Sequence, residues 1–426
     1  MFVSRRFVAA FVLSAAALVG PQGMAQAQEL SGSIRFSWYG GTVRNEKTDK
    51  IVQLFQSKHP GVTVEQEPQD WVKYWERLNV QAAGGMLPCV MSMLPFNLND
   101  YASAGLLADL QPLVDSGQID ASGIPADIVG SGKGTDGKLY MIPYGAAPDT
   151  ITFNASLAER SGIEPLPEKF TWEEYFAWLR EAQGKLPDDV YAIDFPANNP
   201  NLVLAYIGAH GHPIYKDGKL GFPKEVLVDW WTTWQAFANE GVMVPPDMLA
   251  EEPSSHEMSY FAAGRALASS RPANAQGALR AGVEQRGSDD QLAVRLYPTG
   301  PAGVGDIVPA NSLSIAANCS NMPLAAAFVN FFVNDPEAAK IYGSDNGAVT
   351  VTALLEAQLA DPQTSPATKT LLEVFQAVGA RGSRQQAFPS GFQTKFTDLH
   401  KRLTQQVLFG SMSPQEAADA FFAEAQ

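Results

Sequence analysis

Glycines near residue 134 have the spacing of a nucleotide-binding loop. Gly132, Gly134 and Gly137 match a dinucleotide-binding fingerprint, and with Lys138 the same span nearly forms a P-loop. Both motifs need a helix directly after the glycines, because the helix amides bind the phosphate. Here a strand-like segment broken by prolines follows, and Leu139 replaces the Ser or Thr of a P-loop. We therefore predict a turn at this place and no nucleotide site.

Histidines and paired carboxylates give little support for metal binding or hydrolysis. His210 and His212 have no cysteine or carboxylate cluster beside them, so we interpret them as a polar helix end. Adjacent acids occur at 173–174, 188–189 and 251–252, but neighbouring residues on a helix do not face each other. A glycosidase pair lies across a cleft, which the sequence cannot show. Since no G-x-S-x-G nucleophile motif is present either, we predict no catalytic residues, no metal and no cofactor.

Aromatic side chains are stronger candidates for binding. Trp38 and Tyr39 end a predicted strand just before Gly40 and Gly41, and ligands of open α/β sheets bind at such carboxyl ends. Flat aromatic faces suit the apolar faces of sugar rings, although Trp38 could equally pack in the core. Helical spacing favours core packing for two other sets: Trp71, Tyr74 and Trp75, and Trp230, Trp231 and Trp234.

Three arginines are further candidates. Arg271 lies between an apolar, strand-like run and a helix, where a guanidinium could bind a carboxylate, sulfonate or phosphate through two parallel hydrogen bonds. An ion pair on the surface is the equally good alternative. Arg381 and Arg384 lie in a polar loop, from which either could reach a cleft or remain exposed to solvent.

Length and charge limit the class of protein. The chain has 426 residues, enough for two or three domains, and its 46% hydrophobic and 18% charged residues are typical of a globular protein. The net charge of −15 argues against binding to nucleic acid or to an anionic membrane, since both need an excess of Lys and Arg. A local arginine could still bind a small anion.

The N-terminus has the pattern of a signal peptide over residues 1–27. Arg5 and Arg6 precede an apolar segment at 7–20, and residues 24–27 (Met-Ala-Gln-Ala) form a cleavage site. The apolar segment is shorter than the ~20 residues of a membrane span. No cysteine follows the cleavage site, so we expect a soluble periplasmic protein without a lipid anchor. The partial twin-arginine pattern favours Sec export and leaves the Tat route open.

Strands and helices alternate in the first third of the chain. We predict strands at 33–39, 62–65 and 90–94, with helices at 44–59 and 71–83 between them. This order is typical of parallel βα units in an α/β sheet.

A turn at Asp136-Gly137 leads into the extended stretch 138–154, which is interrupted by Pro143 and Pro148. We interpret this stretch as a crossover between two lobes and expect the ligand beside it. Further on, Thr171 and Glu174 have the spacing of a capping box that begins a helix.

Several short segments are weak evidence for a family when taken one by one, but their order along the chain is specific. These segments are 38–41, 82–91, 101–110, 137–144 with 153–154, 171–174, 261–267 and 326–334. Behind a cleavable signal, this order resembles the extracellular solute-binding proteins of ABC importers, of the sugar-binding type that includes maltose-binding protein. The resemblance covers essentially the whole chain after the signal.

The resemblance implies a type II periplasmic-binding-protein fold, with two α/β lobes around a ligand cleft and a hinge of three crossings. Lobe 1 would hold 28–143 and 298–320, and lobe 2 would hold 144–297 and 321–426. The crossings would then lie near 144–150, near 295–298 and after Ser320. Function would be capture of a carbohydrate or a small or acidic sugar derivative by lobe closure. The closed monomer would deliver this ligand to an ABC permease in the inner membrane.

The resemblance also implies a set of ligand contacts. By position these are Trp38, Tyr39, Gly40, Gly41, Thr42, Trp71, Tyr74, Met93, Asn97, Tyr144, Asp149, Asn198, Asn199, Ser270, Arg271, Arg384 and Phe392. The chain departs from the family at Ala273, where a tryptophan is often found. Loss of a stacking ring beside an arginine favours a small or acidic sugar over a long neutral maltodextrin.

Cys89 and Cys319 are the chain's two cysteines, and from counting alone they either pair or remain separate buried thiols. Cys89 stands where the family usually has Asp. The resemblance implies neighbouring antiparallel strands at these positions, which favours a disulfide. Two other functions stay open: a secreted carbohydrate-active hydrolase or lyase, and a binder of the same fold for a polyamine or an organic acid.

Overall fold

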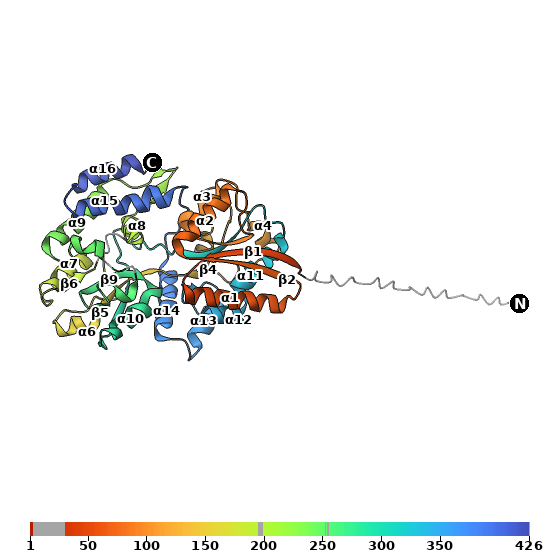
Figure 1. The fold of residues 1–426 in the computed structure, drawn as a ribbon, viewed down its shortest axis with the longest axis horizontal. Coiled ribbons are helices and arrows are strands. Elements are labelled where there is room, and N and C mark those ends of the chain that lie inside the picture. The colour runs from red at the N-terminus through yellow and green to blue at the C-terminus, as the bar shows by residue number, and fades with distance from the viewer. Residues whose placement is uncertain (3–29, 195–198, 252, 254, 426) are drawn as a thin grey trace.

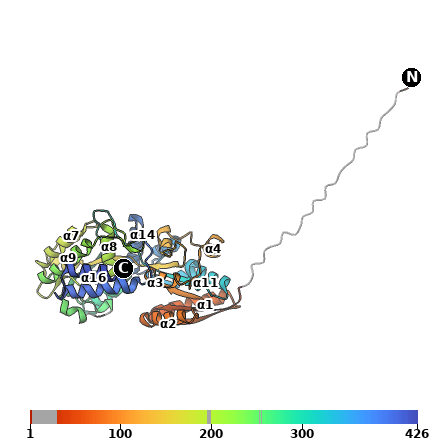
Figure 2. The ribbon, with the colours of Figure 1, turned by 90° about the horizontal axis from the view of Figure 1, so that it is seen from above.

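The computed structural model describes residues 1–2, 30–194, 199–251, 253 and 255–425. The predicted signal peptide therefore lies almost entirely outside the described residues. Among the helices that are described, none combines the length and apolar character needed to cross a membrane. The chain folds into two lobes, which lie side by side in two perpendicular views (Figures 1 and 2).

The first lobe is built on a six-stranded sheet with the order β12-β4-β11-β3-β1-β2. Its strands are β1 (Gly32–Tyr39), β2 (Val62–Gln69), β3 (Val90–Met93), β4 (Ile142–Ala146), β11 (Ala310–Ile315) and β12 (Ala348–Val349). As predicted, β1 runs parallel to β2 and β3, whereas β11 runs antiparallel to β3 and β4. Helices lie on both sides of this sheet, so the last four residues of β1 are buried.

Helices α1, α2 and α11 cover this sheet with amphipathic or fully apolar faces. α1 buries Ile51, Val52 and Phe55 at helical spacing, and the Phe55 ring lies 5.1 Å from that of Phe328 on α11. The helices of this lobe are α1 (Thr42–Lys58), α2 (Trp71–Ala83), α3 (Pro95–Ala102), α4 (Gln111–Asp115), α5 (Ala126–Gly130), α11 (Met322–Asn334), α12 (Pro336–Tyr342), α13 (Thr352–Ala360) and α14 (Pro366–Arg381).

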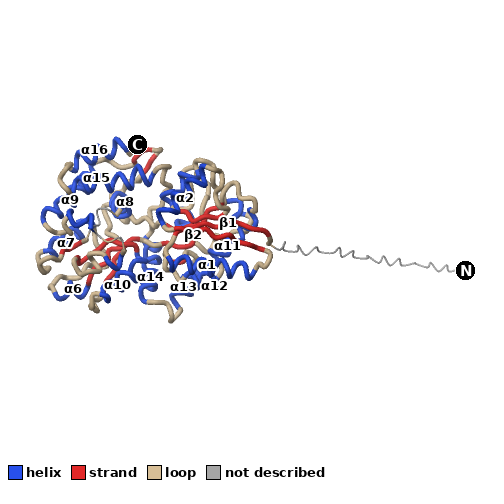
Figure 3. Tube along the Cα trace, in the orientation of Figure 1, coloured by secondary structure: helices blue, strands red, loops and turns tan. Residues whose placement is uncertain are grey.

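The second lobe has a four-stranded sheet with the order β10-β5-β9-β6. Its strands are β5 (Asp149–Asn154), β6 (Tyr191–Ile193), β9 (Ala266–Pro272) and β10 (Leu292–Leu296), and a separate hairpin joins β7 (Tyr215–Lys216) to β8 (Lys219–Leu220). Figure 3 shows the strands of the two lobes as two distinct groups. Around the second sheet lie α6 (Ala155–Arg160), α7 (Trp172–Gln183), α8 (Pro200–Ala209), α9 (Glu225–Glu240), α10 (Gln276–Gln285), α15 (Leu399–Leu408) and α16 (Pro414–Glu424).

Two local predictions hold in this lobe. The capping box is confirmed, because Thr171 Oγ1 accepts from the Glu174 amide while the Glu174 carboxylate accepts from the Thr171 amide. The tryptophans of α9 are confirmed as core residues with no exposed surface: Trp230, Trp231 and Trp234. Short 3-10 turns occupy Pro246–Glu251, His256–Met258 and Ala273–Ala275, and a π-helical turn at Gln393–Asp398 precedes α15.

The chain passes between the lobes at 147–148, at 297–309 and at 382–388. The expectation that the third crossing follows Ser320 and that 321–426 lies in lobe 2 is wrong for α11 to α14. These helices pack in the core of the first lobe, where Phe328 and Phe332 lie 5.0 and 6.0 Å from Phe36 of β1. Only the chain after α14 returns to the second lobe, where Phe388 joins the core.

His400 on α15 is buried, and neither of its ring nitrogens has a hydrogen-bond partner in the described part of the chain. Burial lowers its pKa from 6.5 to about 3. Between these values the unfolded chain binds a proton that the folded chain excludes, so stability falls as the pH decreases. We expect His400→Leu to stabilise the protein by about 2–3 kcal/mol more at pH 4.5 than at pH 8.

Urea unfolding of the wild type and of His400→Leu at both pH values measures this difference. The pH 8 comparison serves as the control, since it contains the change in packing without the change in protonation. An equal effect of the substitution at both pH values would contradict the prediction.

Candidate ligand-binding site

A cavity of about 500 Å³ opens between the two lobes. The first lobe contributes Trp71, Leu94, Phe96, Asn311 and Asn346, and the crossings contribute Ala147 and Pro309. The second lobe contributes Asp149, Asn199, Pro200, Asn201, His256, Ser270, Arg271, Pro272 and Asn274. A molecule in this cavity would therefore contact both lobes at once.

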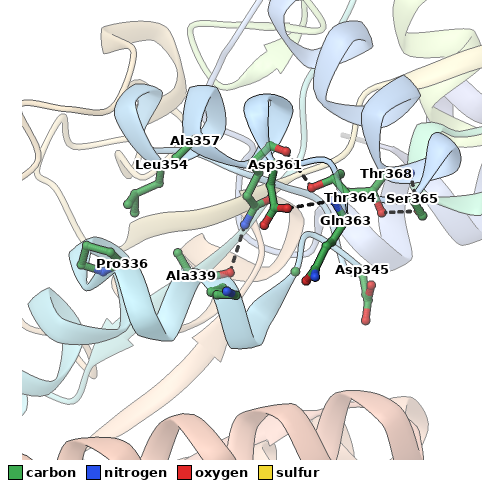
Figure 4. A pocket seen from close by; sticks show the side chains of 13 residues that line it. Pro336, Ala339, Asp345, Leu354, Ala357, Asp361, Gln363, Thr364, Ser365 and Thr368 are labelled. Atoms are coloured by element: carbon green, nitrogen blue, oxygen red, sulfur yellow. Dashed lines mark hydrogen bonds between the residues drawn. The ribbon is translucent and has the colours of Figure 1, made fainter.

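Another cavity, of about 440 Å³, lies in the first lobe alone (Figure 4). Residues of α12, α13 and the start of α14 surround it, among them Ala339, Leu354, Gln358 and Thr368. Its described lining residues include no aromatic side chain and no residue of the second lobe. The cavity between the lobes is the better candidate, because only it can couple a ligand to lobe closure.

Trp71 supplies the exposed aromatic face of the first-lobe wall. It is the first residue of α2, and Asp70 fixes this helix start by accepting from the Lys73 amide at 3.1 Å. The Trp71 side chain is half exposed, and its ring packs edge-on against Tyr39 at 4.7 Å and Trp75 at 5.7 Å. These contacts hold the ring at the cavity while leaving part of its surface open to a ligand.

Arg271 lies on the second-lobe wall in an ion pair. Its Nη2 donates to Asp194 Oδ2 at 2.8 Å, and its Nε donates to Ser269 Oγ at 2.9 Å. Asp194 is buried, so the pair satisfies a carboxylate that water cannot reach. The guanidinium borders the cavity, but these protein partners already hold two of its nitrogens.

A hydrogen-bonded group of neutral side chains adjoins this pair. Asn199 Nδ2 donates to Ser270 Oγ at 3.3 Å and to Tyr297 Oη at 3.4 Å, and the two hydroxyls lie 2.7 Å apart. Asn199 Oδ1 accepts from the Asn201 amide at 2.9 Å, which caps α8. The start of α8 is thereby fixed against β9.

Asp149 is the single carboxylate among the described residues that line the cavity. It is 4% exposed, and its Oδ2 has no hydrogen-bond partner in the part of the chain that the structure describes. Burial raises its pKa to about 7, against the opposing effects of Asn201 and Arg271, and the nearby Asp306 adds to the rise. The carboxyl therefore changes charge near neutral pH.

The structure brings five of the sequence-predicted residues together at the cavity: Trp71, Asp149, Asn199, Ser270 and Arg271. Asn198 lies outside the described residues. The remaining eleven do not line the cavity: Trp38, Tyr39, Gly40, Gly41, Thr42, Tyr74, Met93, Asn97, Tyr144, Arg384 and Phe392.

Core packing explains most of the residues that do not reach the cavity. Trp38 is 2% exposed, and its Nε1 donates to Asn45 Oδ1 at 2.9 Å. The Tyr74 hydroxyl donates to the backbone oxygen of Ser92 at 2.6 Å. Tyr39, Met93, Tyr144 and Phe392 are likewise buried. Arg384 instead donates to the backbone oxygens of the second crossing, Val304 at 2.8 Å and Ala302 at 3.0 Å.

Five polar lining residues were not predicted: Asn201, His256, Asn274, Asn311 and Asn346. Asn311 Nδ2 donates to the Asn346 backbone oxygen at 2.7 Å, so β11 and the loop before β12 present their amides together. The run Asp345-Asn346-Gly347 is a turn pattern that the sequence alone could have indicated. No sequence feature shows that this turn faces the cavity.

Comparisons with known proteins agree with this arrangement. Residues 50–370 match the model of a family described as bacterial extracellular solute-binding protein. A relative from Streptomyces antibioticus, named "Uncharacterized lipoprotein in oleD 5'region", is 25% identical over 297 residues. That match covers 67% of this chain and 63% of the relative, so the chain spans less than two thirds of that protein's length.

Three solved structures illustrate the likeness of fold. A periplasmic solute binding protein from Pectobacterium atrosepticum is 21% identical, with a TM-score of 0.78 over 93% of this chain and 98% of that one. The GacH receptor of Streptomyces glaucescens, solved with acarbose, is 20% identical with a TM-score of 0.73 over 93% and 97%. An oligogalacturonide binding protein from Yersinia enterocolitica is 21% identical with a TM-score of 0.73 over 92% and 97%. Identities this low show the fold alone, and they confirm the predicted two-lobed α/β class.

Proposed function

The chain belongs to the bacterial extracellular solute-binding protein family, and from that premise we propose that it captures a carbohydrate or a small sugar derivative for an ABC importer. The observation that carries the proposal is the cavity of about 500 Å³ lined by both lobes. A ligand that contacts both walls stabilises the closed arrangement by its differential affinity. Closure at the hinge then creates the form that a membrane permease recognises.

The chemistry of the cavity supports a sugar. The exposed face of Trp71 suits the C–H surface of a pyranose ring, and polar side chains around it suit the hydroxyls. These polar groups come from both lobes: Asn199, Asn201, Ser270, Asn274, Asn311 and Asn346. Acarbose and oligogalacturonide in the names of two proteins with this fold add support from analogy.

We propose that the protein acts as a monomer in the periplasm after removal of the predicted signal peptide. The Streptomyces relative is named a lipoprotein, but no cysteine follows the predicted cleavage site at Ala27 until Cys89. A soluble protein that diffuses to its permease is therefore favoured over a lipid-anchored one.

We also propose that the protein does no chemistry on its ligand. A glycosidase needs two carboxyl groups on either side of the scissile bond. Among the described residues that line the cavity, Asp149 alone carries a carboxyl group. Asp194, the nearest acid in the Arg271 network, is already bonded to that arginine.

A thermal-shift screen of the mature protein tests the proposal, with mono- and disaccharides, acidic sugars, polyamines and organic acids as ligands. A ligand at ~100 times its dissociation constant adds about 2.7 kcal/mol, which raises the melting temperature by several degrees. A rise with a sugar and no turnover of that sugar is expected. A rise only with polyamines or organic acids would replace the sugar by another ligand class, and turnover would replace the binding protein by an enzyme.

Trp71→Ala is expected to weaken the binding of a sugar found in that screen by about tenfold. The ring makes aromatic contacts that contribute about 0.5–1.5 kcal/mol beyond buried area, and alanine removes them. Stability should change by less than about 1 kcal/mol, because half of the side chain is already exposed. Isothermal titration calorimetry measures the affinity.

Val80→Ala on the same helix is the matched control, since Val80 is 71% exposed and does not line the cavity. Its affinity should equal that of the wild type. Equal affinities of the Trp71 variant and the wild type would exclude Trp71 from the ligand contacts.

A further inference from the structure

Protein partners already engage hydrogen-bond donors along the wall of the cavity. Arg271 donates through Nε to Ser269 and through Nη2 to Asp194. Asn199 Nδ2 donates to Ser270 and Tyr297, and Asn311 Nδ2 donates to the Asn346 backbone oxygen. A ligand that only accepts hydrogen bonds would compete with these protein partners for the donors.

By contrast, two hydrogen-bond acceptors in the same cavity are buried without a donor from the described part of the chain. Asp149 Oδ2 and Asn201 Oδ1 are both buried, and neither has a hydrogen-bond partner within the described residues. Asp149 begins β5 and Asn201 lies in the first turn of α8, and a side-chain hydrogen bond from Asn201 to the carboxyl group opposes the rise of the Asp149 pKa. The unpaired atoms are thus the second polar atom of each side chain, Asp149 Oδ2 and Asn201 Oδ1. An unsatisfied buried acceptor is costly, so this part of the cavity is complementary to a donor.

Charge leads to the same conclusion. Arg271 is paired with Asp194, and Asp306 near Asp149 is paired with Arg381. Of the three carboxylates Asp149, Asp194 and Asp306, ionised Asp149 is therefore the one that forms no ion pair within the described residues. A carboxylate on the ligand would meet a like charge here.

We propose that the cavity selects a sugar that presents hydrogen-bond donors and no negative charge to Asp149 and Asn201, as a neutral sugar or an amino sugar does. This inference rests on the proposed function and narrows its ligand class. A neutral sugar or an amino sugar thus replaces the acidic sugar derivative that the sequence favoured. Arg271, the residue predicted to bind an anionic ligand, already binds Asp194.

The pH dependence of binding follows from the same contacts. Arg271, Asp306 and Tyr297 interact electrostatically with Asp149, and His256 interacts with Arg271. Burial raises the pKa of Asp149 to about 7, so the carboxyl loses its proton between pH 6 and pH 8. A ligand whose amines stay protonated up to pH 8, such as spermidine, should bind up to about tenfold more tightly at pH 8 than at pH 6, because only the ionised carboxylate attracts its charge.

Isothermal titration calorimetry tests the proposal with the mature protein and four probes: maltose, a glucosamine disaccharide, digalacturonate and spermidine. Asp149→Asn is the test variant, since it keeps the shape of the side chain and removes its charge. Glu159→Gln is the matched control, because Glu159 is an exposed acid on α6 outside the cavity. Thermal unfolding without ligand verifies that each variant is folded.

We expect maltose or the glucosamine disaccharide to bind the wild type and the control equally. Asp149→Asn should weaken that binding by about 10- to 100-fold, and it should abolish the pH dependence of any spermidine binding. If spermidine alone binds and Asp149→Asn abolishes this binding, Asp149 selects hydrogen-bond donors as proposed. The same result would contradict a sugar as the ligand.

Three results would overturn the inference. In the first, digalacturonate binds more tightly than both other sugars. In the second, a sugar binds to Asp149→Asn and to the wild type with equal affinity. Both results would contradict the selection of donors at Asp149 and would leave the proposed sugar-binding function intact. Failure of maltose, the glucosamine disaccharide and spermidine to bind at all would also exclude the proposed donor site.

Discussion

Reduction of the disulfide between Cys89 and Cys319 is expected to lower the free energy of unfolding by about 4–5 kcal/mol. In the structure these residues form a disulfide with a sequence separation of 230. In the chain-entropy model, closing so long a loop restricts the unfolded chain more than almost any local contact can. The bridge joins the ends of β3 and β11, where the Ala316 amide donates to the Cys89 backbone oxygen at 3.0 Å.

Urea unfolding followed by tryptophan fluorescence, with and without a reductant, measures this loss. The chain has two cysteines, so the reductant has no other bridge to break. Cys89→Ala with Cys319→Ala is the matched variant, because it removes the bridge and should no longer respond to the reductant. Reaction of the unfolded, unreduced protein with two equivalents of a thiol reagent would contradict the bridge itself.

The sequence was sufficient for the fold class and the family. Strand and helix periods are local, so the βα alternation of residues 32–93 follows directly from the pattern of apolar residues. The ordered segments that resemble sugar-binding proteins of ABC importers led to a family that the match over 50–370 confirms. The local periodicity of apolar residues and the order of the family segments along the whole chain predict the same fold, which is why these predictions succeed.

The sequence does not predict equally well to which lobe a helix belongs. α11 is apolar over most of its length, so its pattern predicts burial without specifying against which sheet. The contacts of Phe328 and Phe332 with Phe36 decide this, and they join residues almost 300 positions apart in the chain. Such long-range packing explains why the third crossing lies after Arg381 and not after Ser320.

The binding residues show the same limit. Trp38 and Trp71 both lie at the ends of elements beside the predicted cleft, yet one is 2% and the other 50% exposed. Arg271 was found from its position, but its partner Asp194 lies on a separate segment that sequence spacing does not relate to it. Position along the chain therefore identifies candidates, and tertiary partners determine which of them a ligand can use.

Arg381 holds two crossings of the hinge together. At the end of α14 it binds the carboxylate of Asp306 in the second crossing, and its Nη1 donates to the Tyr297 backbone oxygen at 3.0 Å. Asp306 is 2% exposed, and burial raises its pKa while Arg381 opposes the rise. This buried pair ties together segments that must move in concert when the lobes close.

Arg381→Met is expected to lower the free energy of unfolding by about 3–5 kcal/mol at pH 8, because it leaves the buried Asp306 carboxylate without its partner. The loss should shrink toward pH 5. Without the arginine the pKa of Asp306 rises further, so the folded chain binds a proton that the unfolded chain releases, and stability then increases as the pH falls.

Adding Asp306→Asn removes the uncompensated charge and should restore part of the stability at pH 8. Arg384→Met is the control, since Arg384 contacts backbone oxygens through its side chain and should cost less than half as much. Equal losses for the two arginines, or a loss independent of pH, would show that the Arg381–Asp306 pair does not hold the hinge.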